Sequence, residues 1–207
     1  MPLSTHRLSK LKEMYVAAVP GMQLKHKAMF SMKNLYLMMR EWLVENGWVT
    51  YDDEKFPEKL YYHIFHQTAG EEIFIWWRCV KYPPGFENTK YFMYMLDIDF
   101  HILYMKEAET MHNNVKYKVN TGDCEVRLSG RVAFDAQGSW RKDSLLKHMH
   151  TLFTRRIYNK RIAQHRRDLY NEMYRFQEAL KTYFNIATYL PQREDQTFYW
   201  DMKRPLK

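Results

Sequence analysis

Residues 91–104 read YFMYMLDIDFHILY, the stretch with the clearest alternation of side chains in the chain. Successive side chains of a β-strand point to opposite faces of a sheet, so this pattern predicts a strand with one buried face. The face predicted to be buried carries Tyr94, Leu96, Ile98, Phe100 and Ile102. The opposite face carries Met93, Met95, Asp97, Asp99, His101 and Leu103.

Shorter alternating segments lie on both sides of this strand. They are residues 24–32, 59–67, 72–82, 115–119 and 125–135. Thr68-Ala69-Gly70-Glu71 separates the second segment from the third, and Thr121-Gly122-Asp123 separates the last two, so each turn predicts a β-hairpin. The connections from Lys59 to Asp135 are too short for crossover helices. We therefore expect one antiparallel sheet of five to six strands.

Two segments that precede the first hairpin have helical spacing. In residues 33–46 the apolar side chains fall on one side, and Asn46-Gly47 is typical of a helix end. Residues 4–19 repeat apolar side chains every three or four positions, and Pro20-Gly21 would stop that helix. We expect this N-terminal amphipathic helix, within residues 1–23, to pack on the body of the protein. The alternative is an anchor on a membrane surface.

The longest helical pattern lies closer to the C-terminus. Its later apolar stripe consists of Ile162, Leu169, Met173, Phe176, Leu180, Tyr183 and Ala187. The earlier stripe consists of Leu145, Met149, Leu152 and Phe153. At about 100° per residue the two stripes point well over 90° apart. We expect either two helices that meet near residues 158–165 or one helix whose halves bury different faces. The later stripe would pack on the sheet or on another helix, including that of a homodimer through residues 162–187.

The order of elements resembles the helix-grip layout of the START and Bet v 1-like superfamily. The resemblance covers roughly residues 24–153 and implies an α+β core domain with a curved antiparallel sheet on a long C-terminal helix. The basic helical region would continue through residues 154–190, before a tail at 191–207. The runs Ile75-Trp76-Trp77-Arg78 and Leu96-Asp97-Ile98-Asp99-Phe100 are also similar to small archaeal proteins without assigned function. That similarity implies no mechanism.

The net charge of +8 is concentrated in residues 141–167. This window holds nine of the 32 basic residues and one of the 24 acidic residues, so the rest of the chain is formally neutral. Five of these basic side chains would project within a sector of about 140° on a helix. They are Arg155, Arg156, Lys160, Arg166 and Arg167. Such a surface binds polyanions, unless the cations pair with acids of the same chain.

The sequence does not identify the anion. Ile157, Tyr158 and Ile162 interleave with the arginines, which suits a membrane surface or an RNA groove, but no RNP, KH, zinc-finger or helix-turn-helix signature favours sequence readout. We expect a non-enzymatic interaction protein whose basic helix docks on nucleic acid or a ribonucleoprotein, ahead of an anionic membrane surface. A partner protein with an acidic face fits equally well.

Asp97, Asp99 and His101 share one face of the central strand and form a candidate metal or general-base cluster. The residues that would face them from neighbouring strands are His63, Glu125 and Arg131. The solvated outer face of an antiparallel sheet explains the same pattern and is our preferred interpretation. The histidines and the two cysteines lack the spacing of a zinc site, and no phosphate loop or nucleophile motif is present. We therefore predict no catalytic residue, metal or cofactor.

A helix-grip sheet usually leaves a cavity between the sheet and its helix. Here the cavity would be lined by Trp77, Ile98, Phe100, Val132, Leu145 and Met149. The alternative function is therefore a START-like carrier of a hydrophobic small molecule. Large apolar side chains at this spacing are more typical of a close-packed core.

The composition is typical of a protein without a membrane span that resides in a reducing compartment. The longest apolar-rich runs, residues 14–23 and 73–77, are too short to span a bilayer. Residues 1–12 lack the apolar core of a signal peptide. Cys79 and Cys124 are typical of buried, reduced thiols. We expect a cytoplasmic protein.

Overall fold

The computed structural model describes residues 15–50, 56–85, 91–112, 115–135, 140, 146, 149 and 153–188. The strands are β1 (Tyr15–Ala18), β2 (Met22–Phe30), β3 (Glu58–His66), β4 (Gly70–Lys81), β5 (Phe92–His112) and β6 (Val115–Phe134). The helices are α2 (Met32–Glu45) and α5 (Asn159–Thr188), and a π-helical turn, Phe153–Ile157, precedes α5.

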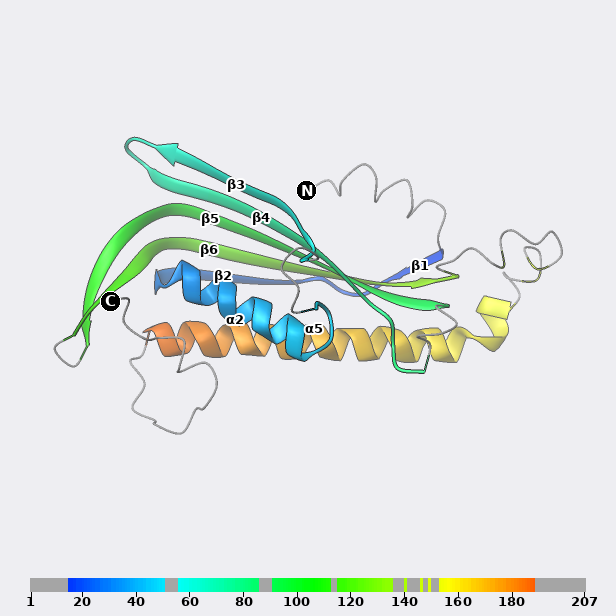
Figure 1. Cartoon of the computed structure of the whole chain (residues 1–207). Helices are drawn as coiled ribbons and strands as arrows, with labels where there is room; N and C mark the ends of the chain where they lie inside the picture. The colour runs from blue at the N-terminus through cyan, green and yellow to red at the C-terminus, as the bar shows by residue number, and fades with distance from the viewer. Residues whose placement is uncertain are drawn as a thin grey trace.

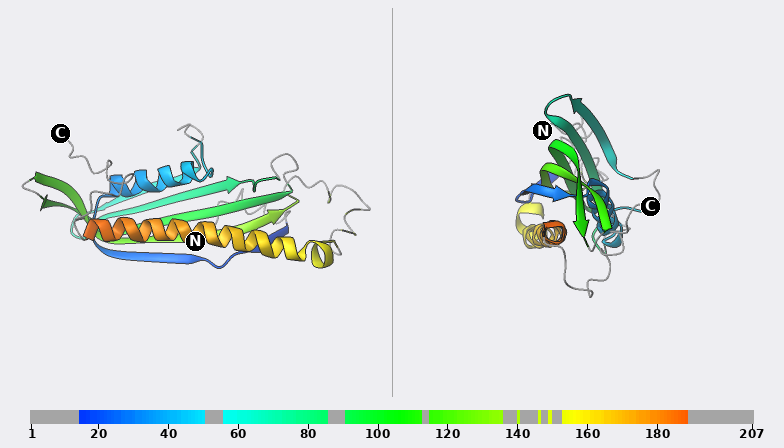
Figure 2. Two further views of the ribbon diagram at one scale, coloured as in Figure 1. Left: turned by 90° about the horizontal axis from the view of Figure 1, so that it is seen from below. Right: turned by 90° about the vertical axis from the view of Figure 1, so that its left-hand side faces the viewer.

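All six strands belong to one antiparallel sheet. Their order is β1-β6-β5-β4-β3, and β2 also pairs with β6. The sheet is curved, and α2 and α5 lie on the same side of it (Figures 1 and 2). This confirms the predicted α+β fold, in which a curved antiparallel sheet packs on a long C-terminal helix.

Helix α2 begins and ends where the sequence predicts. The Ser31 hydroxyl accepts a hydrogen bond from the Asn34 amide at 3.4 Å, which satisfies a donor that has no partner within the helix. Asn46 caps the C-terminus, and Gly47 follows with φ of 68°, a conformation that favours glycine. The buried residues of α2 are those predicted: Leu35, Met38, Met39, Trp42 and Leu43.

The strand predictions on either side of the β3–β4 turn are confirmed. β3 and β4 pair from Leu60↔Trp76 to His66↔Gly70 around the predicted turn. β2 occupies the predicted first strand, and its side chains alternate between exposed and partly buried along the strand. β5 begins where expected but continues to His112, well beyond the predicted end at residue 104.

The predicted hairpin around Thr121-Gly122-Asp123 is wrong, because these residues lie within the continuous strand β6. The β5–β6 pairing extends to His112↔Val115 instead, and its register shifts between Leu103 and Lys106. A Cβ atom on Gly122 would lie only 2.8 Å from the carbonyl oxygen of Leu103. Gly122 therefore permits the close approach of the two strands at an irregularity in the ladder.

The predicted N-terminal helix is also corrected. Residues 15–18 form β1, which pairs with β6 from Tyr15↔Phe134 to Ala18↔Arg131. The amide of Val19 donates a hydrogen bond to the carbonyl of Gly130 at 3.0 Å and extends the contact. Pairing with the free edge of β6 satisfies these backbone groups and overrides the local helical pattern. Residues 4–14 of the predicted helix lie outside the described residues.

Helix α5 is the core helix of the fold. A π-helical turn ends at Ile157, and the Tyr158 amide bonds to the Phe153 carbonyl at 2.9 Å before α5 begins. The π-helical turn and α5 are separate elements that meet at Tyr158, while most residues of the earlier apolar stripe lie outside the described part of the chain. The inward residues of α5 belong to the same hydrophobic core as the strands; they are Leu169, Met173, Phe176, Leu180, Tyr183 and Phe184.

Of the partners predicted for this stripe, the sheet or another helix, including that of a homodimer through residues 162–187, the structure shows the sheet. Leu169, Met173 and Phe176 are each 0% exposed, since they pack beneath the sheet of their own chain. The apolar face that such a dimer would use is already covered within one protomer.

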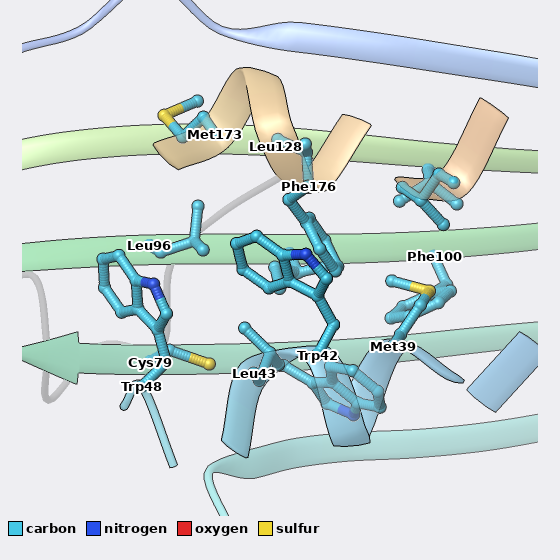
Figure 3. Packing of buried hydrophobic residues seen from close by; sticks show 14 of the residues in the cluster. Met39, Trp42, Leu43, Trp48, Cys79, Leu96, Phe100, Leu128, Met173 and Phe176 are labelled. Atoms are coloured by element: carbon cyan, nitrogen blue, oxygen red, sulfur yellow. The ribbon is translucent and has the colours of Figure 1, made fainter. Parts of the chain in front are cut away.

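Aromatic and sulfur-containing side chains fill the layer between the sheet and the helices (Figure 3). The Trp42 and Phe176 rings, from α2 and α5, have centroids 4.7 Å apart. Trp77 on β4 lies edge-to-face with Phe100 of β5 at 4.9 Å and with Tyr36 of α2 at 5.0 Å. These contacts attach both helices to the centre of the sheet.

Candidate anion-binding face of helix α5

Helix α5 presents opposite faces to the sheet and to solvent. Burial of Leu169 and Phe176 fixes the rotation of the helix about its axis. At about 100° per residue, a sector of about 120° beside the buried stripe then includes, among other residues, five lysine, arginine and tyrosine side chains. All five are exposed, and they are Lys160, Arg166, Arg167, Tyr170 and Tyr174. The outward face of α5, as the term is used below, means these five residues.

The cations of the outward face are not neutralised by the rest of the described chain. Three of them form no ion pair with a described carboxylate: Lys160, Arg166 and Arg167. Of the three acids on this helix, Glu172 pairs with Lys81 at 2.9 Å and Glu178 pairs with Lys181 at 2.8 Å, while Asp168 forms no ion pair with these cations. The hydrogen bond from Lys181 lowers the pKa of Glu178 and keeps its carboxyl group charged. The positive charge of the outward face therefore reaches solvent.

Four of the five predicted anion-binding residues are described in full. Arg156 lies in the π-helical turn that leads into α5, and its side chain is exposed without an ion pair to any described residue. The backbone of Arg155 belongs to the same turn, while its side chain lies outside the described part of the chain. The structure thus places Arg156 and Lys160 at the start of α5 and Arg166 and Arg167 about two turns further on.

The apolar residues predicted to interleave with these cations behave differently from one another. Ile157 is 62% exposed. Tyr158 instead packs its ring on Phe153, with centroids 4.4 Å apart, and Ile162 is partly buried against the core. Only Ile157 of the three is therefore available to a partner of the basic segment.

Sequence reasoning missed the exposed tyrosines of the outward face. Tyr170 is 40% exposed and Tyr174 is 48% exposed. Lys181 lies over the Tyr174 ring, with its Nζ atom 5.7 Å from the centroid. The signal was present in the sequence, because Tyr170 follows Arg166 by four positions and Tyr174 follows Arg167 by seven, both spacings that share a helix face. The structure adds that Tyr170 is exposed, whereas Lys181 of the same helix lies over one face of the Tyr174 ring.

A separate open groove of about 660 Å³ lies on another side of α5, next to Pro83 and Pro84. Its charged lining residues are Arg161, Asp168, Glu172 and Arg175. Within it, the Tyr94 hydroxyl lies 2.7 Å from Nδ1 of His165. Burial lowers the pKa of His165; nearby Asp168 opposes this effect and Arg161 adds to it. The groove combines both signs of charge and a neutral imidazole, so it does not favour an anion.

The predicted acidic cluster on β5 forms ion pairs with neighbouring strands. Arg78 Nη1 lies 2.5 Å from Asp99 Oδ1, and Arg131 Nη2 lies 3.2 Å from Asp97 Oδ2. Asp97 is only 3% exposed and Arg78 only 6%. The preferred interpretation as a solvated outer face is thus corrected at this point, because the central charges are buried and mutually neutralised.

The remaining members of this predicted cluster are engaged in similar pairs. His101 Nε2 lies 2.8 Å from Glu72, and His63 Nε2 lies 3.0 Å from Glu71. Glu125 pairs with Lys25 at 3.0 Å. Among the described residues, no group of three histidine, cysteine or acidic side chains is arranged to hold a metal ion.

The residues predicted to line a ligand cavity lie in two environments. Trp77, Ile98, Phe100 and Val132 are at most 1% exposed and pack in the hydrophobic core. Met149 is 51% exposed, so its side chain does not line the interior. Leu145 lies outside the described residues.

Comparisons with known proteins identify no family. No family model and no curated protein matches the chain. One solved structure with a weak likeness is that of an uncharacterised protein from Rhizobium leguminosarum, with 4% identity over 83% of this chain and 97% of the other. Its TM-score of 0.20 is too low to carry an argument. The helix-grip and archaeal resemblances remain predictions. None of the described helices is long and apolar enough to cross a bilayer.

Proposed function

We propose that the protein binds nucleic acid through the outward face of α5, extended by Arg156. The single observation that carries this proposal is the exposure of four cations that have no carboxylate partner among the described residues. Exposed cations that form no ion pair within their own chain produce a positive potential, which attracts a polyanion. Binding of this kind needs no catalytic residue, cofactor or metal.

Nucleic acid is favoured over an anionic membrane because of Tyr170 and Tyr174. A hydroxylated ring that stands among arginines on a helix face suits stacking against an unpaired base, which typically contributes about 1–3 kcal/mol per base. Insertion into a membrane surface instead requires a continuous apolar face. The apolar face of α5 is buried against the sheet. Single-stranded RNA or DNA, free or in a ribonucleoprotein, is therefore the proposed class of partner.

The test is charge reversal on the outward face. We expect the triple variant Lys160→Glu, Arg166→Glu and Arg167→Glu to lose binding to a fluorescent single-stranded RNA, measured by anisotropy at several salt concentrations. For single strands, each lost phosphate contact reduces the slope of log K against log salt by about 0.7. The slope should therefore fall by roughly 2 if all three cations contact phosphates.

A matched control reverses three exposed lysines elsewhere, Lys106, Lys116 and Lys118, on strands β5 and β6. This variant has the same net charge as the first and should retain binding and slope. Equal losses in the two variants would show that affinity follows net charge alone and would refute the proposal. Binding to anionic vesicles but not to RNA would refute it as well and would assign the face to a membrane.

The carrier of a hydrophobic ligand is the less favoured function. Its predicted lining is occupied by protein contacts, as the 4.9 Å separation of the Trp77 and Phe100 rings illustrates. A cytoplasmic location is part of the main proposal. Both cysteines, Cys79 and Cys124, are free and buried, which suits a reducing compartment.

A further inference from the structure

Strand β3 forms one edge of the sheet. Among the described strands it pairs only with β4, in continuous register from Leu60 to His66. Figure 1 shows the β3–β4 hairpin as the margin of the sheet farthest from α5. One row of backbone N–H and C=O groups of β3 therefore faces away from the sheet and can pair with another strand.

The side chains of β3 are unusually apolar for an exposed edge. Tyr61 is 53% exposed, Tyr62 is 54% exposed and Phe65 is 73% exposed, the highest value for a large hydrophobic side chain among the described residues. No lysine, arginine, acid or proline interrupts residues 60–66. Free edge strands of soluble proteins usually carry such residues, because they prevent edge-to-edge association.

Strand β2, at the opposite side of the sheet, shows the usual protection. It alternates exposed Lys25 and Lys27 with its partly buried residues. Lys25 pairs with Glu125 and Lys27 with Asp123, so both lysines are fixed along β2. The chain thus protects one margin of its sheet by charge and leaves the other margin apolar. This asymmetry indicates that a partner strand covers β3.

We propose that this partner is β3 of a second copy of the chain, paired antiparallel about a two-fold axis near Tyr62. Such a pairing is isologous, so the segment must complement itself. With Tyr62 at the axis, Leu60 of each copy opposes Ile64 of the other, and Tyr61 opposes His63. Each of these pairs joins aromatic, aliphatic or imidazole side chains on the same face of the extended sheet.

Charge also favours the antiparallel copy. Lys59 is exposed at the start of β3 and forms no ion pair with a described carboxylate. Toward the other end, the Glu71 carboxylate reaches across to His63, 3.0 Å from its Nε2 atom. Antiparallel pairing brings the Lys59 end of each copy toward the Glu71 end of the other, twice by symmetry. A parallel copy would instead place Lys59 beside Lys59.

The oligomeric state of the full chain tests this proposal. Sedimentation equilibrium of the wild-type protein should show a reversible monomer–dimer equilibrium. The variant Tyr62→Lys places like charges together at the two-fold axis and should weaken dimerisation by about tenfold or more. The matched control is Met111→Lys, which changes charge equally at a 62% exposed residue of β5 and should dimerise as the wild type does. Circular dichroism confirms that each variant is folded.

A spin-label experiment distinguishes strand pairing from other modes of association. Labels attached at Tyr62→Cys should show strong dipolar broadening in the dimer, since both lie near the axis, whereas labels at Met111→Cys should not. A wild-type protein that remains monomeric at all concentrations overturns the proposal. A dimer that is insensitive to Tyr62→Lys also overturns it. So does a dimer whose labels at position 62 are far apart, because that dimer would form through another surface.

Discussion

Asp97 shows how an acidic residue can look functional in sequence and be structural in the fold. Its carboxylate lies between Arg78, whose Nε atom is 3.8 Å away, and Arg131, whose Nη2 atom is 3.2 Å away. This carboxylate is 3% exposed and, together with Asp99, neutralises the buried Arg78, while it also pairs with the partly exposed Arg131. The residue therefore supports the centre of the sheet.

The variant Asp97→Asn should accordingly destabilise the fold. We expect the free energy of unfolding in urea to fall by about 3 kcal/mol, the typical cost of removing one partner of a buried ion pair. The control is Glu109→Gln, because Glu109 is 63% exposed and pairs with Lys116 at 3.7 Å. Its loss should be below about 1 kcal/mol. A loss as small for Asp97→Asn would contradict the structural role.

His165 should contribute to loss of stability in acid. Burial holds the pKa of His165 below the unfolded value of 6.5; the charge of Arg161 lowers this pKa further, and the charge of Asp168 raises it. As the pH falls below 6.5, the unfolded chain takes up the proton first, so the folded state loses stability down to the lowered pKa. Above pH 6.5 the imidazole is neutral in both states, so His165 no longer makes the stability depend on pH. Unfolding free energies of His165→Gln should fall less steeply with acid than those of the wild type; parallel curves would count against this account.

At the scale of the element, one face of α5 stabilises the fold, and another face is proposed to bind the partner. Leu169→Ala removes a fully buried side chain and should reduce the free energy of unfolding by about 2–5 kcal/mol. Tyr170→Ala, one residue later on the exposed face, should change it by less than about 0.5 kcal/mol and should weaken RNA binding. Denaturant unfolding and anisotropy of the same two proteins measure both effects. Comparable destabilisation by both variants would show that Tyr170 is part of the core.

The elements that sequence reasoning placed correctly are those with a strong local period. The strand at β5 and the helix α2 have repeats of two and about 3.6 residues, and their burial follows those repeats. β1 could not be found in this way, because its pairing with Phe134 joins residues far apart in the sequence. Thr121-Gly122-Asp123 has the composition of a turn, yet the contact that requires Gly122 comes from Leu103 on another strand.

The candidate site was predictable only in part, for related reasons. Charge counting located Arg166 and Arg167, because an excess of charge is visible without any structure. Whether those cations would be neutralised depended on which acids the fold brings near them. The acids Glu172 and Glu178 turned out to pair with Lys81 and Lys181 instead. The exposure of Tyr170 likewise depended on the direction in which α5 packs.

For the molecule as a whole, the two proposed surfaces do not overlap. Helix α5 lies below the sheet in the view of Figure 1, whereas β3 lies at the margin of the sheet farthest from that helix. Pairing along β3 would therefore leave the cations of both copies accessible. On the sheet, the central Arg78 and Arg131 are bound to Asp99 and Asp97. Failure of either proposal leaves the other intact.

The position of β6 has a consequence for biosynthesis. β6 pairs with β1 and β2, and Tyr15 meets Phe134 only after the ribosome has made more than a hundred further residues. At ordinary elongation rates this takes roughly 5 to 25 seconds. During that interval β1 and β2 lack their pairing partner β6, and the apolar face of the sheet is not yet covered by α5. We therefore expect the sheet to be completed only after most of the chain has been synthesised.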